Sequence, residues 1–248
     1  MNIIFRIKRY QPENDKKSFF QDFTFEAELT SRVLDALMFI KRNLDGTLSF
    51  RKSCAHGVCG SDAMTINGIE RLACKTLIQD VAEKDDDVIT IEPLKSLPVQ
   101  RDLMVDYTRF FETYRIVKPF LIPIENHPNT SLEDATLKEN IQMPEERKKI
   151  DDPTKCILCA SCYASCPVVA EKDPDFIGPA AVVQAARFVF DSRDKGIEPR
   201  LEILDDPHGA WPCENHMNCT KVCPRGIKVT KNINFIKREI KNFKEQND

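Results

Sequence analysis

Seven of the ten cysteines fall into two runs whose spacing suits iron–sulfur clusters. The first run, Cys156-x2-Cys159-x2-Cys162-x3-Cys166-Pro167, has the bacterial ferredoxin pattern C-x2-C-x2-C-x3-C-P. In that pattern three cysteines hold one cluster and the fourth ligates the other. Thiolates are soft, charged donors that suit iron bridged by sulfide. The run therefore predicts a pair of clusters rather than one.

The second run, Cys213-x5-Cys219-x3-Cys223-Pro224, is a degenerate copy of the first. Overlaying the two runs aligns its cysteines with the first, third and fourth positions and puts His216 at the second. Exchanging the fourth ligands predicts a [4Fe–4S] cluster on four thiolates: Cys156, Cys159, Cys162 and Cys223. Three thiolates remain, and a cubane corner without a thiolate tends to lose its iron, so [3Fe–4S] is predicted on Cys166, Cys213 and Cys219.

His216 leaves two interpretations open. Its imidazole could ligate a fourth iron at the second position of the run. Alternatively it lies near the cluster and gives only a hydrogen bond, which is the interpretation that we favour because missing cysteines accompany trinuclear clusters.

The remaining cysteines fit the plant-type [2Fe–2S] pattern C-x4-C-x2-C with a distant fourth cysteine, except that Asp62 stands at the third position. The predicted ligands are Cys54, Cys59, Asp62 and Cys74. A carboxylate is a harder donor than a thiolate but can complete a tetrahedron around iron. In the alternative, Asp62 only bonds its own loop, and Ser61 or a solvent atom is the fourth ligand.

Gly57 and Gly60 lie within the same loop. Without a Cβ, they allow the backbone to fold tightly. We expect the loop to aim N–H groups at the sulfurs, which tunes the reduction potential of a cluster.

Zinc is the competing explanation for closely spaced cysteines. Structural zinc sites typically use two separated pairs per metal, whereas cysteines three apart in succession, followed by Cys-Pro, surround a cubane. The spacing favours iron–sulfur clusters, and it assigns all ten cysteines.

The composition is that of a globular protein and excludes several classes. A hydrophobic fraction of 42% with 30% charged residues allows a sizeable core, and a net charge of −3 with interspersed bases gives no reason to expect nucleic acid. The first eight residues lack the apolar stretch of a secretory signal, so we expect a reducing compartment in which thiols serve metals. The longest stretch without charge spans residues 156–170, whereas a spanning helix needs about 20 mainly apolar residues. The chain is therefore not expected to cross a membrane.

The helices and strands that must position these ligands change from mainly strands to mainly helices near residue 100. Ile3, Phe5 and Ile7 alternate with polar residues, as half-buried strands do. Further signals are a helix over 31–44 capped by Ser31, a tight hairpin at Asn67-Gly68, and a strand over 88–91. Together they predict a small mixed sheet packed on one helix.

The second half is predicted to be mostly helical. Apolar residues recur at spacings of three and four over 104–114 and 233–243, and Pro179 suits the first residue of a helix. The polar stretch 127–153 predicts a surface connection ahead of the cysteines.

The quoted motifs closely resemble the iron–sulfur subunit of succinate dehydrogenase and its fumarate reductase relatives, over essentially the whole chain. The matching segments are 53–62, Leu72-Ala73-Cys74, 97–103, 155–167, 176–180, 191–194, Asn218-Cys219 and 223–226. Asp62 favours the succinate dehydrogenase branch but does not fix the direction of turnover.

The resemblance implies an α+β protein with a plant-ferredoxin-like β-grasp domain over residues 1–103 and an all-α, bacterial-ferredoxin-like domain over 104–248. Electrons would pass from FAD in a separate flavoprotein subunit through [2Fe–2S], [4Fe–4S] and [3Fe–4S] to a quinone beside a membrane-anchor subunit. The chain would lie on the cytoplasmic face of the bacterial inner membrane, held by anchor subunits. It would carry electrons without binding the dicarboxylate.

Two positions depart from many ubiquinone-reducing relatives. Where those relatives have a histidine near quinone and haem, this chain has Glu214, and where they have a quinone-contacting tryptophan it has Glu171. The quinone type, and haem b in the anchor, therefore stay open. No catalytic residue is expected, since the chain has no G-x-G-x-x-G fingerprint and no nucleophile–base–carboxylate set. A free ferredoxin is the remaining alternative.

Overall fold

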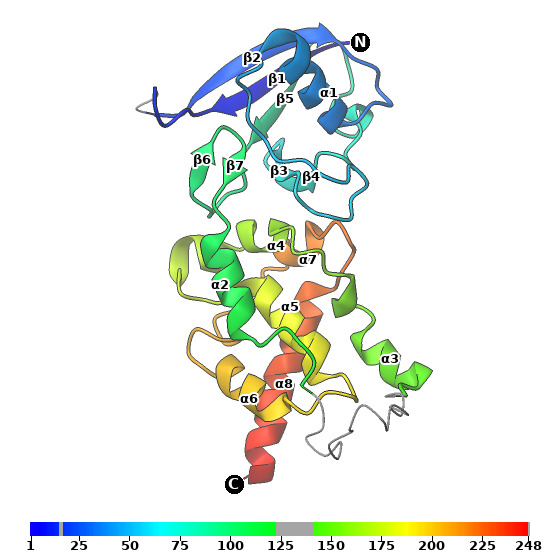
Figure 1. Cartoon of the computed structure of the whole chain (residues 1–248), viewed down its shortest axis with the longest axis vertical. Coiled ribbons are helices and arrows are strands. Elements are labelled where there is room, and N and C mark those ends of the chain that lie inside the picture. Colours follow the sequence, from blue (N-terminus) through cyan, green and yellow to red (C-terminus); the bar gives the residue numbers. More distant parts are fainter. Residues whose placement is uncertain (15–16, 123–140, 248) are drawn as a thin grey trace, which may run out of the picture.

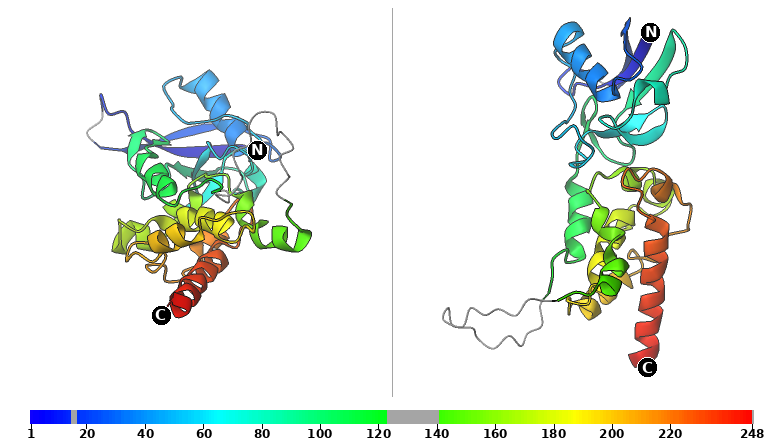
Figure 2. Two further views of the ribbon diagram at one scale, coloured as in Figure 1. Left: turned by 60° about the horizontal axis from the view of Figure 1, so that its bottom comes forward. Right: turned by 90° about the vertical axis from the view of Figure 1, so that its right-hand side faces the viewer.

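The computed structural model describes residues 1–14, 17–122 and 141–247. A half built around a β-sheet and a helical half lie one above the other along the long axis of the molecule (Figure 1). A side view gives the same separation (Figure 2). The short hairpin of β6 (Val99–Arg101) and β7 (Met104–Val105) lies close to the junction (Figure 1). The change of character near residue 100 is therefore confirmed.

The N-terminal half contains a five-stranded mixed sheet in the order β2-β1-β5-β3-β4. Its strands are β1 (Asn2–Arg9), β2 (Phe19–Glu26), β3 (Ala63–Ile66), β4 (Ile69–Leu72) and β5 (Asp87–Glu92). β1 and β5 run parallel, and the other pairs are antiparallel. The predicted alternation in β1 is confirmed, because Ile3, Phe5 and Ile7 are all fully buried.

One helix packs against this sheet, as predicted. It comprises α1 (Val33–Phe39) and a π-helical continuation, η1 (Ile40–Leu44). The ring of Phe39 lies 4.7 Å from that of Phe25 on β2, between ring centroids. The short 3-10 helix η2 (Ile78–Asp80) precedes β5.

The predicted cap of this helix is wrong by one residue. Arg32, not Ser31, is the residue before the helix, and its backbone N–H donates to Asp35 Oδ2 at 3.1 Å. The carboxylate of Asp35, at the third helical position, thus accepts the free backbone N–H at the N-terminus of the helix, so a Ser31 hydroxyl is not needed there. The hairpin prediction is confirmed, since Asn67 and Gly68 both have left-handed φ values, +47° and +79°, as a tight two-residue turn requires.

The helical half is built on α5 (Gly178–Val189), which packs against α8 (Val229–Asn247). Ile233, Ile236 and Ile240 of α8 are buried, which confirms the predicted periodicity. Pro179 is the second residue of α5, one position later than the predicted first residue, and still lies in the first turn, where a missing N–H costs no helical hydrogen bond. The shorter elements are α3 (Pro144–Ile150), η3 (Pro153–Lys155), α4 (Ser161–Ala164), η4 (Val168–Lys172), α6 (Ile197–Leu204) and α7 (Asn218–Lys221).

Two predictions about this half need correction. The helix predicted from residue 104 begins later, as α2 (Thr108–Ile116), because Met104 belongs to β7 (Met104–Val105) and pairs with β6 (Val99–Arg101). The predicted connection over 127–153 carries α3 and η3 in its second part, whereas residues 127–140 lie outside the described residues.

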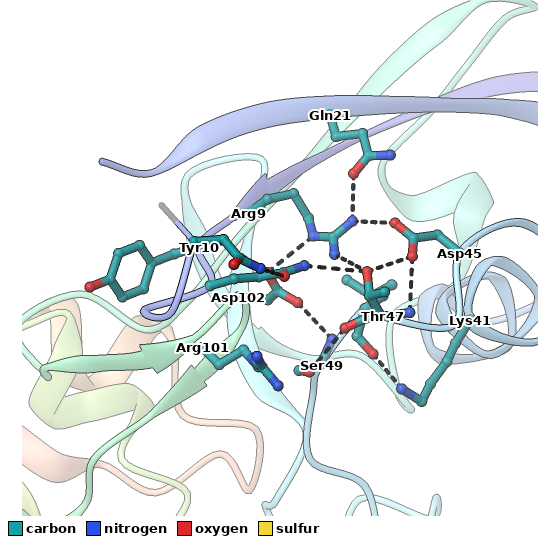
Figure 3. A network of polar contacts seen from close by, with 12 residues as sticks. Arg9, Tyr10, Gln21, Lys41, Asp45, Thr47, Ser49, Arg101 and Asp102 are labelled. Carbon is teal, nitrogen blue, oxygen red and sulfur yellow. Dashed lines mark hydrogen bonds and ion pairs between the residues drawn. The ribbon is translucent and has the colours of Figure 1, made fainter. Parts of the chain in front are cut away.

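A buried arginine links the hairpin to the sheet (Figure 3). Arg9, at the end of β1, is 1% exposed. Its guanidinium donates to Asp102 Oδ1 at 3.0 Å and Asp45 Oδ2 at 2.6 Å, and also bonds Gln21 and Thr47. Asp102 in turn accepts N–H groups from Tyr10 and Ser49. The network therefore fixes the loop leading to the first cysteines and the hairpin leading to α2.

Among the described residues, no helix has the length and apolar character needed to cross a bilayer.

Candidate iron–sulfur sites

The first cysteine group lies on a tightly curled loop between η1 and β3. Ala55, Gly57 and Gly60 all adopt left-handed φ values, between +57° and +70°. This curl brings the backbone N–H groups of His56 and Cys59 to 3.3 Å from Cys54 Sγ. N–H groups of the loop, His56 first, lower the pKa of Cys54 to about 6. The loop therefore favours a thiolate near neutral pH, which is the form that binds metal.

Asp62 is buried, and its two carboxylate oxygens differ in their surroundings. The side chain is 2% exposed, and Oδ2 accepts the backbone N–H of Cys74 at 2.6 Å. Oδ1 is buried and has no hydrogen-bond partner. Such an orphaned oxygen is costly unless another group, such as a metal ion, faces it. Asp62 therefore fits a ligand to iron better than a carboxylate that bonds only its own loop.

Cys74, at the end of β4, completes this group. Burial, then the Asp62 carboxylate, and to a lesser extent Cys54, raise the pKa of Cys74 to about 12. The 2.6 Å bond from its backbone N–H to Asp62 Oδ2 places Cys74 beside that predicted ligand. Ser61, the other candidate for fourth ligand, has its hydroxyl 3.2 Å from Cys59 Sγ.

The second site is a cavity that four cysteines line from two distant segments. They are the four predicted [4Fe–4S] ligands, Cys156, Cys159, Cys162 and Cys223. The rest of the lining comes from other residues of the two cysteine segments, including Arg225, and from apolar residues such as Val183 of α5 and Val229 of α8. Burial, followed by repulsion from the neighbouring cysteines, raises the pKa of Cys162 well above its usual range. Iron cations bound among the four sulfurs would offset this repulsion and allow thiolates there, so the residues fit the cluster.

The backbone of the third group repeats that of the second. Leu158 and Ala160, on either side of Cys159, have left-handed φ values of +54° and +62°. Asn215 and Met217, on either side of His216, have φ values of +61° and +65°. A four-residue helix follows in each case, α4 in one and α7 in the other. His216 thus has the backbone environment of the second cysteine.

The third group consists of Cys166, Cys213 and Cys219, which lie close enough to repel one another. Burial raises the pKa of Cys166 and of Cys219. Cys213 and Glu214 add to the rise at Cys166, and Cys213 and Cys166 add to the rise at Cys219. His216 Nε2 lies 2.9 Å from Glu214 Oε2, and its side chain is 42% exposed. The group therefore offers three buried or half-buried sulfurs, while its histidine is engaged with a carboxylate.

The two glutamates that depart from many relatives lie beside this third group. Glu214 forms an ion pair with Lys172 of η4, and this pair, followed by the bond to His216, lowers its pKa. Glu171 lines a cleft that also contains Cys166. Both glutamates therefore place a charged side chain on the surface next to the predicted [3Fe–4S] ligands.

One hydroxyl lies beside each group; sequence reasoning considered Ser61 only as a candidate ligand and missed Ser161 and Thr230. Ser61 Oγ lies 3.2 Å from Cys59 Sγ, Ser161 Oγ lies 3.4 Å from Cys159 Sγ, and Thr230 Oγ1 lies 3.5 Å from Cys219 Sγ. Ser161 could have been found, because it stands two residues after Cys159, as Ser61 does after Cys59. Thr230 comes from α8 and has no local signal.

A sheet domain and a helical domain, each with converging cysteines, define a ferredoxin-type iron–sulfur protein. Two family models match the chain in the same order: a 2Fe-2S iron-sulfur cluster binding domain over residues 4–112 and a 4Fe-4S dicluster domain over residues 152–227.

Relatives that match over most of their length indicate which ferredoxin-type iron–sulfur proteins the chain resembles. The succinate dehydrogenase iron-sulfur subunit of Coxiella burnetii is 38% identical over 95% of this chain and 96% of its own length. The fumarate reductase iron-sulfur subunit of Mycobacterium tuberculosis is 41% identical over 91% of this chain and 87% of its own length. A chain of the Mycobacterium smegmatis Sdh1 complex in the apo form has a TM-score of 0.85 at 28% identity, covering 98% of this chain and 97% of that one.

The chain belongs to the family of iron–sulfur subunits of succinate dehydrogenase and fumarate reductase, which carry electrons in these oxidoreductases. The resemblance inferred from the motifs is thereby confirmed. The matched domains also agree with the cofactors predicted from the cysteine spacing.

Proposed function

We propose that this chain carries single electrons from FAD of a flavoprotein subunit, through [2Fe–2S], [4Fe–4S] and [3Fe–4S] clusters in series, to a quinone beside a membrane-anchor subunit. The proposed ligands of the three clusters, in that order, are Cys54, Cys59, Asp62 and Cys74; Cys156, Cys159, Cys162 and Cys223; and Cys166, Cys213 and Cys219. The single observation that carries the proposal is the cavity lined by four cysteines from two segments, as exchanged fourth ligands require.

Each site's residues prepare it for one-electron chemistry. When bound, the clusters supply the redox change, and the chain fixes their order and surroundings. Several of the cysteines are buried, a loop N–H group donates to Cys54 Sγ, and the Ser161 hydroxyl lies beside Cys159 Sγ. Asp62 gives the first site a harder donor. Since cluster type, burial and hydrogen bonding set reduction potentials, the three sites are expected to differ in potential.

We also propose the finer fold assignment that the resemblance implies. The sheet order β2-β1-β5-β3-β4 with one helix supports a plant-ferredoxin-like β-grasp domain over residues 1–103. The helices after residue 107 support an all-α ferredoxin-like domain over 104–248. Because the β6–β7 hairpin spans 99–105, a truncation that tests these domains should keep the whole hairpin on the N-terminal piece.

The partners and location follow from the complex to which the relatives belong. The structural match is to a chain of an Sdh1 complex, which supports a flavoprotein and membrane anchors as partners. The chain would then lie peripherally on the cytoplasmic face of the bacterial inner membrane. The fumarate reductase direction is the second candidate, favoured by the Mycobacterium tuberculosis relative of that name.

Purification of the native complex, followed by an EPR redox titration, tests the proposal. We expect co-purification with a flavoprotein and small membrane subunits, and about nine irons per chain in three distinct clusters. Zinc in place of iron and acid-labile sulfide would refute the cluster assignment. A native protein that is isolated alone with its clusters intact would instead indicate a free ferredoxin. Comparison of succinate oxidation with fumarate reduction by the same complex distinguishes the two directions.

A further inference from the structure

The loop of the first site touches the second site at Gly60. A Cβ placed on Gly60 would lie 2.6 Å from Cys159 Cβ and 2.9 Å from Cys159 Cα, whereas ordinary van der Waals contact begins at 3.4 Å. The backbones of the two domains therefore meet where only a hydrogen atom fits. Gly60 lies between Cys59 and Asp62, so this contact joins the proposed [2Fe–2S] loop directly to a proposed [4Fe–4S] ligand.

A second contact joins the same two sites. Lys75 follows Cys74, and its ammonium donates to the carbonyl oxygen of Pro224 at 3.3 Å. Pro224 in turn follows Cys223. Thus both loops of the first site meet the second site beside a ligand, and we call these two contacts the inter-site seam.

We propose that Gly60 is the positioning residue that sets the separation of the [2Fe–2S] and [4Fe–4S] sites, and thereby the rate of electron transfer between them. The proposal rests on the proposed function, which assigns the ligands on both sides of the seam. In the step concerned, the first site is oxidised by one electron and the second is reduced by one. No bond forms or breaks and no proton moves. Because electronic coupling falls steeply with separation, a methyl group at the seam would slow the step without changing any ligand.

The same loop contains a matched control in Gly57. Gly57 and Gly60 both have a φ of +70°, so alanine imposes the same backbone strain at either position. The two differ in what a Cβ would meet. At Gly57 it would meet the side-chain stem of Lys75, which is exposed and can rotate away, giving up its bond to Pro224. At Gly60 it would meet the backbone of Cys159, which cannot rotate away. Gly57→Ala therefore disturbs the Lys75 contact of the seam and leaves the Gly60 contact in place.

The test compares Gly60→Ala with Gly57→Ala in the intact complex. Iron and sulfide analysis and the midpoint potentials first establish that the clusters are loaded and unaltered. The decisive readout is the magnetic interaction between the two reduced clusters, seen as faster spin relaxation of the [2Fe–2S] EPR signal. We expect Gly60→Ala to weaken this enhancement and to slow arrival of electrons at the [4Fe–4S] site in freeze-quench experiments. Gly57→Ala should retain both properties.

Wild-type relaxation and rate in Gly60→Ala would overturn the proposal, and so would an equal loss in both variants. If Gly60→Ala does not load its first cluster, the wild-type complex still decides, because absence of relaxation enhancement there contradicts contact between the sites. Failure of the proposed function has a different outcome, since the wild-type complex would then lack the cluster signals themselves.

Discussion

The backbone N–H of Cys74 holds one oxygen of Asp62 at 2.6 Å, while the other oxygen is buried with no hydrogen-bond partner. The first contact orients the carboxylate and joins the end of β4 to the cysteine loop. The second oxygen is then available to a ligand that the protein itself does not supply. A loop aspartate that served only its own backbone would have no reason to bury an unsatisfied oxygen.

Asp62→Ala should therefore abolish the [2Fe–2S] cluster and leave the other two intact. The reason is that only Asp62 offers a free, buried oxygen in that loop. We expect a loss of about two irons per chain and of the corresponding EPR signal. Ser61→Ala is the matched control and should keep the cluster. The opposite pattern, with the cluster lost in Ser61→Ala and retained in Asp62→Ala, would make Ser61 the ligand.

His216→Cys should convert the trinuclear cluster to a tetranuclear one. The left-handed residues on either side of His216 reproduce the backbone around Cys159, so a thiol there is placed to hold a fourth iron. Iron content should rise by about one per chain, and the EPR signal of the oxidised trinuclear cluster should disappear. His216→Ala provides the control and should leave that signal unchanged. Loss of iron in His216→Ala would mean that the imidazole is a ligand.

Thr230→Val should lower the reduction potential of the trinuclear cluster. Thr230 N–H donates to Thr220 Oγ1, and the two hydroxyls lie 3.0 Å apart. Since an iron-bound Cys219 thiolate can only accept, Thr230 must donate to it and accept from Thr220. Removal of that donor destabilises the more negative, reduced form. We expect a shift of about 59 mV, a tenfold change in the one-electron equilibrium.

Ser161→Ala serves as the reciprocal control, because its hydroxyl lies beside Cys159 of the [4Fe–4S] site. Each variant should shift only its own cluster in an EPR redox titration. Potentials that move together, or not at all, would show that these hydroxyls do not tune individual clusters.

Asp45 should give the protein acid-sensitive stability. Burial opposes ionisation, but hydrogen bonds from Thr47 and Arg9 lower the pKa of Asp45 from 3.8 to about 2. A lowered pKa means that the stabilisation is complete above pH 3.8 and is lost as pH falls towards 2. The free energy of unfolding should therefore differ most between wild type and Asp45→Asn above pH 4, and least near pH 2. Denaturant titrations followed by circular dichroism measure this difference, and a difference independent of pH contradicts it.

Most of the fold could be predicted from local patterns. The alternation of Ile3, Phe5 and Ile7 and the helical spacing of α8 each arise within a few residues, so the sequence alone reveals them. The start of α2 could not be found this way, because Met104 suits a helix but pairs with β6 instead. Tertiary pairing overrides periodicity at such a junction.

The candidate ligands were predictable because cluster binding constrains cysteine spacing. The groups around them were not, since they come from distant segments. Thr230 reaches Cys219 from α8, and Cys159 meets Gly60 across the two domains. The Arg9 network likewise connects β1, the Asp45 loop and Asp102. No local sequence pattern predicts such a connection.

The proposed exchange of fourth cysteines between the two runs would affect how the helical domain acquires its iron. Cys166 and Cys223 each lie on one run and face the partner run's sulfurs. A cluster bound at either site would link the two segments covalently. This link would reduce the conformational entropy lost when the ligands of the other site come together. Maturation of this domain should accordingly be cooperative, with half-loaded chains scarce and chelation of one site hastening loss from its neighbour.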